Sequence, residues 1–277
     1  MGVTIIARRR IYWSLFLAAC ACLAAFVPLF LFIPKVGVSP AFLEGAGALK
    51  VFSLGSMKIP SHYFAGAGVG LCALYAALAL ALILFSFRKT ASTEVFFFAF
   101  WVLSVGFEVS RLGAFALAAG GGTTYMQVAG ARALLFTRYA GYLALFTSGL
   151  YASGFRNEKL GAVLSVVLVV ALGLALAMPI NTGSFAPTLE IRAGYAQLNA
   201  TLMVIIGLVT VANFFYAAAY KGERAYRLVA LGAAALIVGY RLLVSQWHPA
   251  LMLTGFALIV AGSWLFVSRL HAYYLWQ

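Results

Sequence analysis

Residues 63–87 read YFAGAGVGLCALYAALALALILFSF, a run without a single charged side chain. At a rise of about 1.5 Å per residue, a helix of this length crosses a hydrocarbon core of about 30 Å. Such a run is typical of a transmembrane helix rather than of a helix in a water-soluble domain. The stretch therefore predicts that lipid is the solvent of this protein.

The same pattern recurs along the whole chain of 277 residues. With 65% apolar and 9% charged residues, the chain has too little polar surface to coat a water-soluble globule. We predict an all-α fold, a polytopic integral membrane helix bundle with eight transmembrane helices. The predicted spans are residues 11–33, 63–87, 94–119, 133–154, 161–180, 198–220, 227–246 and 249–270. Since the last two are joined only by Trp247-His248-Pro249, one broken or re-entrant element and seven crossings are the alternative.

The charges of the loops predict how the chain is oriented. Eleven of the nineteen Lys and Arg residues lie in loops on the N-terminal side of the spans, and five lie on the other side. The positive-inside rule then places both termini in the cytoplasm, in a bacterial-type inner membrane or plasma membrane. The net charge of +13 is explained by basic loops that meet anionic lipid headgroups, so we expect membrane lipids and no nucleic acid as partners.

Two outer loops resemble each other and predict an internal repeat. Residues 34–47 read PKVGVSPAFLEGAG, and residues 179–194 read PINTGSFAPTLEIRAG. The fourth span of each half matches as well, with ALLFTRYA at 133–140 and ALMLTGFA at 250–257. An even number of spans per half gives a 4+4 parallel repeat within a single membrane domain. The alternative is chance likeness among Ala-rich and Leu-rich segments. The predicted halves are residues 1–160 and 161–277.

Four charged residues fall in the interior of predicted spans rather than at their ends: Glu108, Arg111, Arg138 and Arg241. A charge near the bilayer centre costs roughly 2.5–3.5 kcal/mol, so each of them needs a partner or a wet cavity. Glu108 and Arg111 are three residues apart, share a helical face and can pair. The three arginines are predicted at one level, roughly 6–8 Å to the outer side of the midplane. With one carboxylate nearby, they carry a surplus of about two positive charges, which a bound anion would relieve.

These charges define the candidate site. A guanidinium group suits a carboxylate, sulfate or phosphate because it donates two parallel hydrogen bonds. The alternative is a structural role, in which the arginines reach headgroups or neighbouring carbonyl groups and the tyrosines beside them only pack. The candidate ligand-binding residues are Arg111, Arg138, Arg241, Glu108, Tyr139 and Tyr240.

Signals for other chemistry are weak, and we expect neither a cofactor nor a metal. A b-type haem needs opposed histidines at one depth, and His62 and His248 are predicted at the outer membrane edge. A lipid-modifying enzyme would have Glu108 as its embedded acid, but acid–base chemistry needs a second titratable group. The GxxxG spacing of Gly66 and Gly70 permits close approach of another helix.

The sequence therefore favours a membrane protein that binds an anionic or amphiphilic small molecule or lipid in the outer half of its bundle, as a transporter or ligand sensor. The alternative is a non-catalytic scaffold or accessory subunit, with another membrane protein or a second copy of the chain as its partner.

Overall fold

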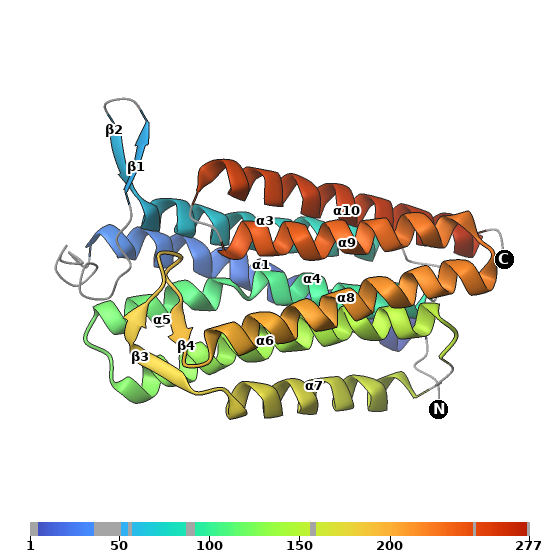
Figure 1. Cartoon of the computed structure of the whole chain (residues 1–277), viewed down its shortest axis with the longest axis horizontal. Coiled ribbons are helices and arrows are strands. Elements are labelled where there is room, and N and C mark those ends of the chain that lie inside the picture. Colours follow the sequence, from blue (N-terminus) through green and yellow to red (C-terminus); the bar gives the residue numbers. More distant parts are fainter. Residues whose placement is uncertain are drawn as a thin grey trace.

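The computed structural model describes residues 5–35, 51–54, 57–86, 92–155, 159–245 and 248–275. It is a helix bundle with two short antiparallel hairpins, β1–β2 and β3–β4, which confirms the predicted fold class (Figure 1). The helices are α1 (Ile5–Lys35), α3 (Ser61–Ser86), α4 (Thr93–Gly106), α5 (Val109–Ala119), α6 (Thr124–Ala152), α7 (Leu160–Ala177), α8 (Ala196–Lys221), α9 (Arg224–Ser245) and α10 (Pro249–Leu275). The strands are β1 (Val51–Leu54), β2 (Met57–Pro60), β3 (Ile180–Phe185) and β4 (Ile191–Ala193).

Seven helices of the described chain are long and apolar enough to cross a membrane, with α4 and α5 counted as one span. The eighth long helix, α6, is less apolar and carries Arg132 and Arg138. It packs against α4, α5, α7 and α8, which shield most of its length from lipid. Because Arg138 is buried among protein groups rather than in hydrocarbon, its charge is tolerated within this helix. The eight predicted spans thus correspond to eight long helices.

Helices α9 and α10 are two separate, antiparallel helices, so the alternative of one broken element is wrong (Figure 1). They pack at very close range through glycines. A Cβ on Gly239 would lie 2.8 Å from the carbonyl oxygen of Gly255, and a Cβ on Gly255 would lie 2.7 Å from that of Gly239. Both positions therefore need glycine for the two backbones to approach.

Two predicted spans differ from the structure in detail. The span predicted at 161–180 ends as a helix at Ala177, because Pro179 has no N–H to continue the helix and strand β3 follows. The span predicted at 94–119 is interrupted by a turn at Phe107 and Glu108. There the N–H of Glu108 donates to the carbonyl of Val105, three residues back.

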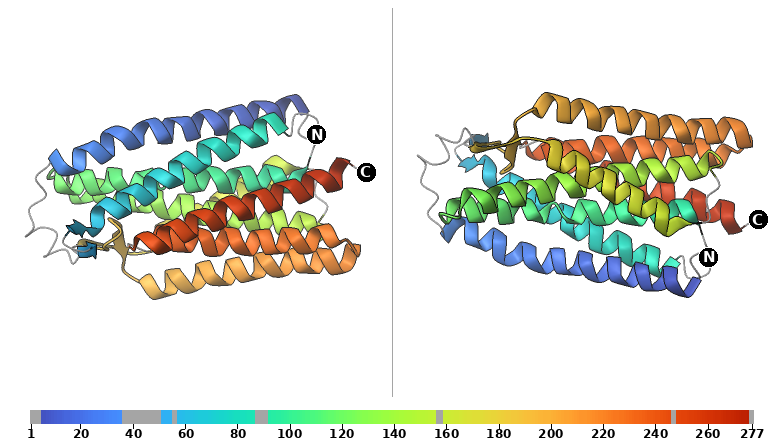
Figure 2. Two further views of the ribbon diagram at one scale, coloured as in Figure 1. Left: turned by 90° about the horizontal axis from the view of Figure 1, so that it is seen from above. Right: turned by 90° about the horizontal axis from the view of Figure 1, so that it is seen from below.

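Both hairpins lie at one end of the bundle, while α1 begins and α10 ends at the other (Figures 1 and 2). We call these the hairpin end and the terminus end. In each predicted half, a hairpin follows the first helix. The first of the two similar loops falls mostly on residues 36–50, including Glu44, which lie outside the described residues. The internal repeat therefore stays a prediction.

The GxxxG pair on α3 lies at an interface with α1, where side chains of α1 fill the space at the two glycines. A Cβ on Gly66 would lie 2.5 Å from the ring of Phe30, and a Cβ on Gly70 would lie 2.6 Å from the ring of Phe26. The two phenylalanines stack on each other, with ring centroids 5.3 Å apart. The absence of side chains at the two glycines thus makes room for two aromatic rings.

The core of the bundle lies along α4, where aromatic side chains are fully buried. Phe96, Phe97, Phe98 and Trp101 are at most 1% exposed. Large aliphatic side chains on the outer faces point away from the core and are exposed. They include Leu78, Leu82, Val166, Val169, Leu208 and Leu253. This distribution fits a protein whose outer surface meets lipid.

Candidate functional site: a buried network of charges at the hairpin end

Glu108 lies in the turn between α4 and α5 and is the centre of a network of charged side chains. Its side chain is inaccessible to solvent, and its carboxylate accepts hydrogen bonds from three helices. Arg111 Nη2 donates at 2.5 Å, Arg138 donates from Nε at 2.7 Å and from Nη2 at 3.0 Å, and the Tyr240 hydroxyl donates at 2.5 Å. The predicted pairing of Glu108 with Arg111 is confirmed. The turn at Phe107 and Glu108 places this carboxylate where α5, α6 and α9 meet.

A second carboxylate enters the network from the turn between β3 and β4. Glu190 accepts two hydrogen bonds from Arg138, from Nη1 at 2.6 Å and from Nη2 at 3.0 Å, and Nη2 also donates to Glu108. The turn is inserted among the helices, since Thr188 and Leu189 are 6% and 1% exposed. Leu189 has a φ of 65°, which is unusual for a branched side chain and is held by this packing. The hairpin therefore forms a plug at this end of the bundle.

Arg111 joins the plug to two helices. Its Nη1 donates to the carbonyl of Thr188 at 3.1 Å and to that of Val244 in α9 at 3.2 Å, while its Nη2 pairs with Glu108. The Val244 carbonyl lies one residue before the end of α9. The guanidinium group of Arg111 thus binds acceptors within the protein, as is expected if Arg111 has a structural role.

These contacts correct the charge balance that the sequence predicts. The expectation of a single nearby carboxylate is wrong, because Glu190 pairs with Arg138. The network and its neighbour Arg241 contain two carboxylates and three guanidinium groups. The surplus is therefore one positive charge rather than two.

Arg241 is the cation that carries this surplus. Its side chain is half-buried, and in the described ranges its guanidinium group forms neither an ion pair nor a hydrogen bond. It lines a cavity of about 20 Å³ together with Arg138, Tyr142, Asn199 and Tyr240, and Met203, Val244 and Ser245 complete the lining. This volume holds about one water-sized group.

Tyr142 and Asn199 add polar groups to this cavity. The Tyr142 side chain is 3% exposed, and its hydroxyl has no hydrogen-bond partner in the part of the chain that the structure describes. A buried hydroxyl without a partner is destabilising, so a ligand or water that accepts from it would be favoured. The Asn199 carbonyl oxygen accepts from the Tyr139 hydroxyl at 2.8 Å, which directs the amide group.

The predicted site residues are thus only partly brought together. Glu108, Arg111, Arg138 and Tyr240 share one network, and Arg241 lies beside it across the cavity. Tyr139 is fully buried and reaches the cavity only through Asn199.

Sequence reasoning missed Glu190 as a member of the site. The acid was visible within the loop match, but its position in an outer loop gave no sign that the loop tip inserts between helices. Tyr142 lies four residues after Arg138, so its sequence position places it beside the charged residues, whereas Asn199 carries no signal of its own.

Burial alone would raise the pKa of the Glu190 carboxyl group. The charges of Arg138 and Arg111, with the hydrogen bonds from Arg138, outweigh this desolvation and hold the pKa below its ordinary value of 4.5. Glu190 is therefore ionised at neutral pH, and its pairing with Arg138 is intact there.

A second buried acid lies at the terminus end. Glu94, in the first turn of α4, is 2% exposed and accepts from the Tyr274 hydroxyl at 2.7 and 2.9 Å. The Tyr226 and Ser92 hydroxyls also donate to it, at 3.3 and 3.1 Å. Lys221 reaches this group only through the Tyr226 hydroxyl, at 3.0 Å. Glu108 is thus not the one embedded acid that the sequence indicates.

Comparisons with known proteins identify a relative without a described function. The chain is similar to an uncharacterized protein of Treponema pallidum (strain Nichols), with 26% identity over 253 residues, covering 74% of this chain and 73% of that protein. No protein-family model and no solved structure matches the chain.

Proposed function

We propose that this multi-pass membrane protein binds an anionic or amphiphilic small molecule, or the acid group of a lipid, at the cavity beside Arg241. The observation that carries the proposal is the half-buried guanidinium group of Arg241, which has no acid partner among the described residues. One surplus positive charge beside a cavity favours an anion. The buried Tyr142 hydroxyl supplies a second donor without a partner there.

The size of the cavity limits what enters it. About 20 Å³ admits a group about as large as a water molecule, such as one oxygen of an acid group, with the rest of the ligand outside the cavity. The exposed side chain of Ser245 and the half-buried Arg241 mark the more open side. A carboxylate on an apolar chain fits these constraints, because the acid would meet Arg241 and the chain would meet lipid.

Glu190 would act as an internal counter-anion for such a ligand. Arg138 also lines the cavity, and two of its donor positions face the Glu190 carboxylate. An acid group that binds Arg241 competes with Glu190 for the hydrogen bonds of Arg138. Displacement of Glu190 from Arg138 would loosen the β3–β4 plug. Ligand binding and movement of the plug are linked in this proposal.

The predicted repeat favours transport over sensing. Two similar halves can rock against each other about a shared site. With the protein in a bacterial-type inner membrane or plasma membrane and both termini in the cytoplasm, the cavity would lie near the outer side of that membrane. A sensor would instead need a partner at the terminus end to pass on the signal.

The test is a titration of the purified full chain with decanoate and, separately, with inorganic phosphate. Wild-type protein is expected to bind decanoate with a saturable rise in melting temperature. Arg241→Gln is expected to weaken this binding at least tenfold, because the surplus charge is removed. Arg132→Gln removes an exposed arginine of α6 outside the cavity and serves as the matched control.

A scaffold or accessory subunit is the second candidate. Its support is that Arg111 and Arg138 are engaged in pairs within the protein, as structural arginines are. If neither probe binds, or if both arginine variants bind as wild type does, the scaffold is favoured and the anion site is rejected.

A further inference from the structure

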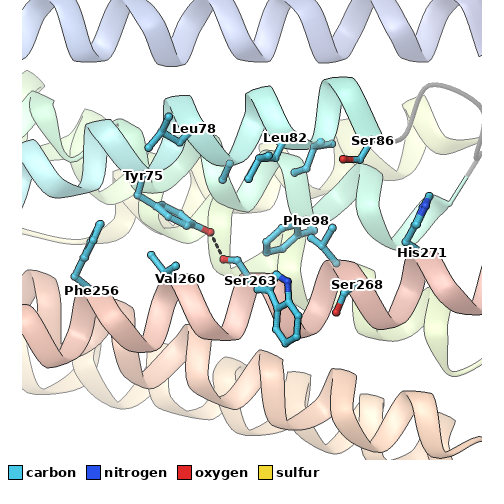
Figure 3. Close-up of a pocket in the computed structure, with 14 residues that line it drawn as sticks. Tyr75, Leu78, Leu82, Ser86, Phe98, Phe256, Val260, Ser263, Ser268 and His271 are labelled. Carbon is cyan, nitrogen blue, oxygen red and sulfur yellow. Dashed lines mark hydrogen bonds between the residues drawn. The ribbon is translucent and has the colours of Figure 1, made fainter.

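A groove between α3 and α10 lies apart from the charged network. Its volume is about 440 Å³, and it runs between Tyr75 and Ser86 on α3 and between Phe256 and His271 on α10 (Figure 3). We call it the α3–α10 groove. Tyr75, Ile83 and Phe98 are buried and form its floor, where the Tyr75 hydroxyl and the Ser263 hydroxyl are 2.6 Å apart. This contact ties the two helices together beneath the opening.

The rims of the groove are exposed and apolar. Leu78 and Leu82 of α3 are 57% and 65% exposed, and Trp264 of α10 is 68% exposed. Both helices are apolar enough to span a membrane, so these rims face hydrocarbon rather than water. Since water is not the solvent at this depth, the groove is filled from the membrane.

The length of the groove fits a hydrocarbon chain. From Phe256 to His271, α10 rises about 22 Å, which exceeds the depth of one leaflet, about 15 Å. The groove is therefore long enough for an acyl chain that extends from the membrane surface to the bilayer centre.

The distribution of polar residues along the groove indicates how a bound lipid is oriented in it. Ser86, Ser268 and His271 lie together toward the terminus end, whereas Phe256 and Leu78 lie toward the other end (Figure 3). Arg269 of α10 is exposed at the same end but does not line the groove. An apolar groove with a polar mouth, at an end of the bundle that carries exposed arginines, is complementary to an anionic headgroup on an acyl chain.

Exposed arginines extend this positive character across the terminus end. Besides Arg269, they include Arg9 and Arg10 of α1 and Arg227 of α9. Juxtamembrane basic residues attract anionic lipids over about a Debye length, so they would enrich such lipids around the mouth.

We propose that the α3–α10 groove binds one acyl chain of an anionic phospholipid from the leaflet at the terminus end, with the headgroup at the mouth formed by Ser86, Ser268 and His271 and with Arg269 attracting its charge from nearby. The site is separate from the Arg241 cavity and does not depend on the function proposed there. The lipid fills the space between two helices that would otherwise lack packing partners along this face.

Photo-crosslinking of the full wild-type chain in nanodiscs tests the proposal. The probe is phosphatidylglycerol with a diazirine on one acyl chain, present as a minor component in phosphatidylcholine. Labelling of the α3 and α10 residues that line the groove is expected to exceed labelling around the exposed Leu208 of α8 at least fivefold. Equal labelling of the groove and α8 overturns the proposal, as does equal labelling by phosphatidylcholine with the same diazirine chain.

Variants provide an independent readout by native mass spectrometry. Val260→Trp fills the groove and is expected to reduce retained phosphatidylglycerol at least fivefold, while Leu208→Trp, on an exposed face, retains it. Arg269→Gln lies outside the helix core and is expected to remove the preference for phosphatidylglycerol over phosphatidylcholine even if Val260→Trp does not fold. Arg241→Gln should leave retention unchanged. Unchanged retention in both Val260→Trp and Arg269→Gln overturns the proposal.

Discussion

Glu108 and Glu94 are buried carboxylates on the same span, about 21 Å apart along the helix, and the protein stabilises them in different ways. At the hairpin end, Glu108 is surrounded by the guanidinium groups of Arg111 and Arg138 and by one hydroxyl. At the terminus end, Glu94 is surrounded by hydroxyl groups and has no cation within ion-pairing distance among the described residues.

The two regions differ in what happens to the neighbouring groups when the buried acid is replaced. A buried ion pair fixes both partners, because removing one leaves the other charged and unpaired. Where hydroxyl groups donate to a buried carboxylate, replacement of that carboxylate leaves no cation without a partner. The hairpin end is therefore the more sensitive region, and it is also where the charges do not balance.

The largest expected effect comes from Glu108→Gln. This change leaves Arg111 and Arg138 with less negative charge nearby, so the free energy of unfolding should fall by about 3–5 kcal/mol. Denaturation with SDS in mixed micelles measures this change. A loss of less than 1 kcal/mol would contradict the view that the network is held by its central carboxylate.

Glu94→Gln makes the same chemical change at the terminus end and is the matched control. An amide can still accept from the Tyr274 and Tyr226 hydroxyls through its oxygen. We expect a loss of about 1–3 kcal/mol, since no buried cation loses its partner. If this variant is as unstable as Glu108→Gln in the same SDS titration, the contrast between the two regions is wrong.

Glu190→Gln should have a smaller effect of about 1 kcal/mol on global stability, because this carboxylate is half-buried in a turn. Its local effect is larger. Hydrogen–deuterium exchange at residues 186–190 is expected to rise as the Arg138 pair weakens and the plug loosens. Unchanged exchange in this variant would show that the plug is held by its apolar contacts alone.

Acid should have the same local effect on the wild-type plug. Because the pKa of Glu190 lies below 4.5, the stabilisation from its ion pair is fully present above that pH. It is lost as the pH falls through the lower pKa of the folded state. Exchange at 186–190, corrected for the intrinsic effect of pH, should therefore rise below pH 4.5 in wild type and change little in Glu190→Gln.

Arg241→Gln is expected to change stability least, by less than about 0.5 kcal/mol, because no acid in the described chain loses a partner. The removal of an unpaired charge from a half-buried position can even be stabilising. The same SDS titration checks this expectation, and a loss above 2 kcal/mol would indicate that Arg241 has a structural role instead.

Periodicity and length predict most of the fold, because each span must satisfy its backbone within a helix of fixed minimum length. The Glu108 and Arg111 pair follows from helical spacing alone. The grouping of Arg111, Arg138 and Arg241 also follows from span positions, since Arg111 and Arg138 meet in one network and Arg241 lies beside Arg138, while their depth in the membrane stays a prediction.

The rest of the site depends on contacts between distant parts of the chain. Glu190 reaches Arg138 because a hairpin turn inserts between helices, and no local pattern in residues 179–194 predicts that insertion. Glu94 meets hydroxyls that are 132 and 180 residues away, on Tyr226 and Tyr274. Packing decides such pairs, and the periodicity of a single span does not contain that information.

The most direct test of the central claim is a structure of the wild-type protein with bromoacetate, whose bromine locates a bound carboxylate by anomalous scattering. We expect one bromoacetate at the hairpin end, with its carboxylate within hydrogen-bonding distance of the Arg241 guanidinium group and the Tyr142 hydroxyl. A structure in which that cavity holds only water or remains closed at saturating bromoacetate, with Arg241 directed toward lipid headgroups, would contradict the account.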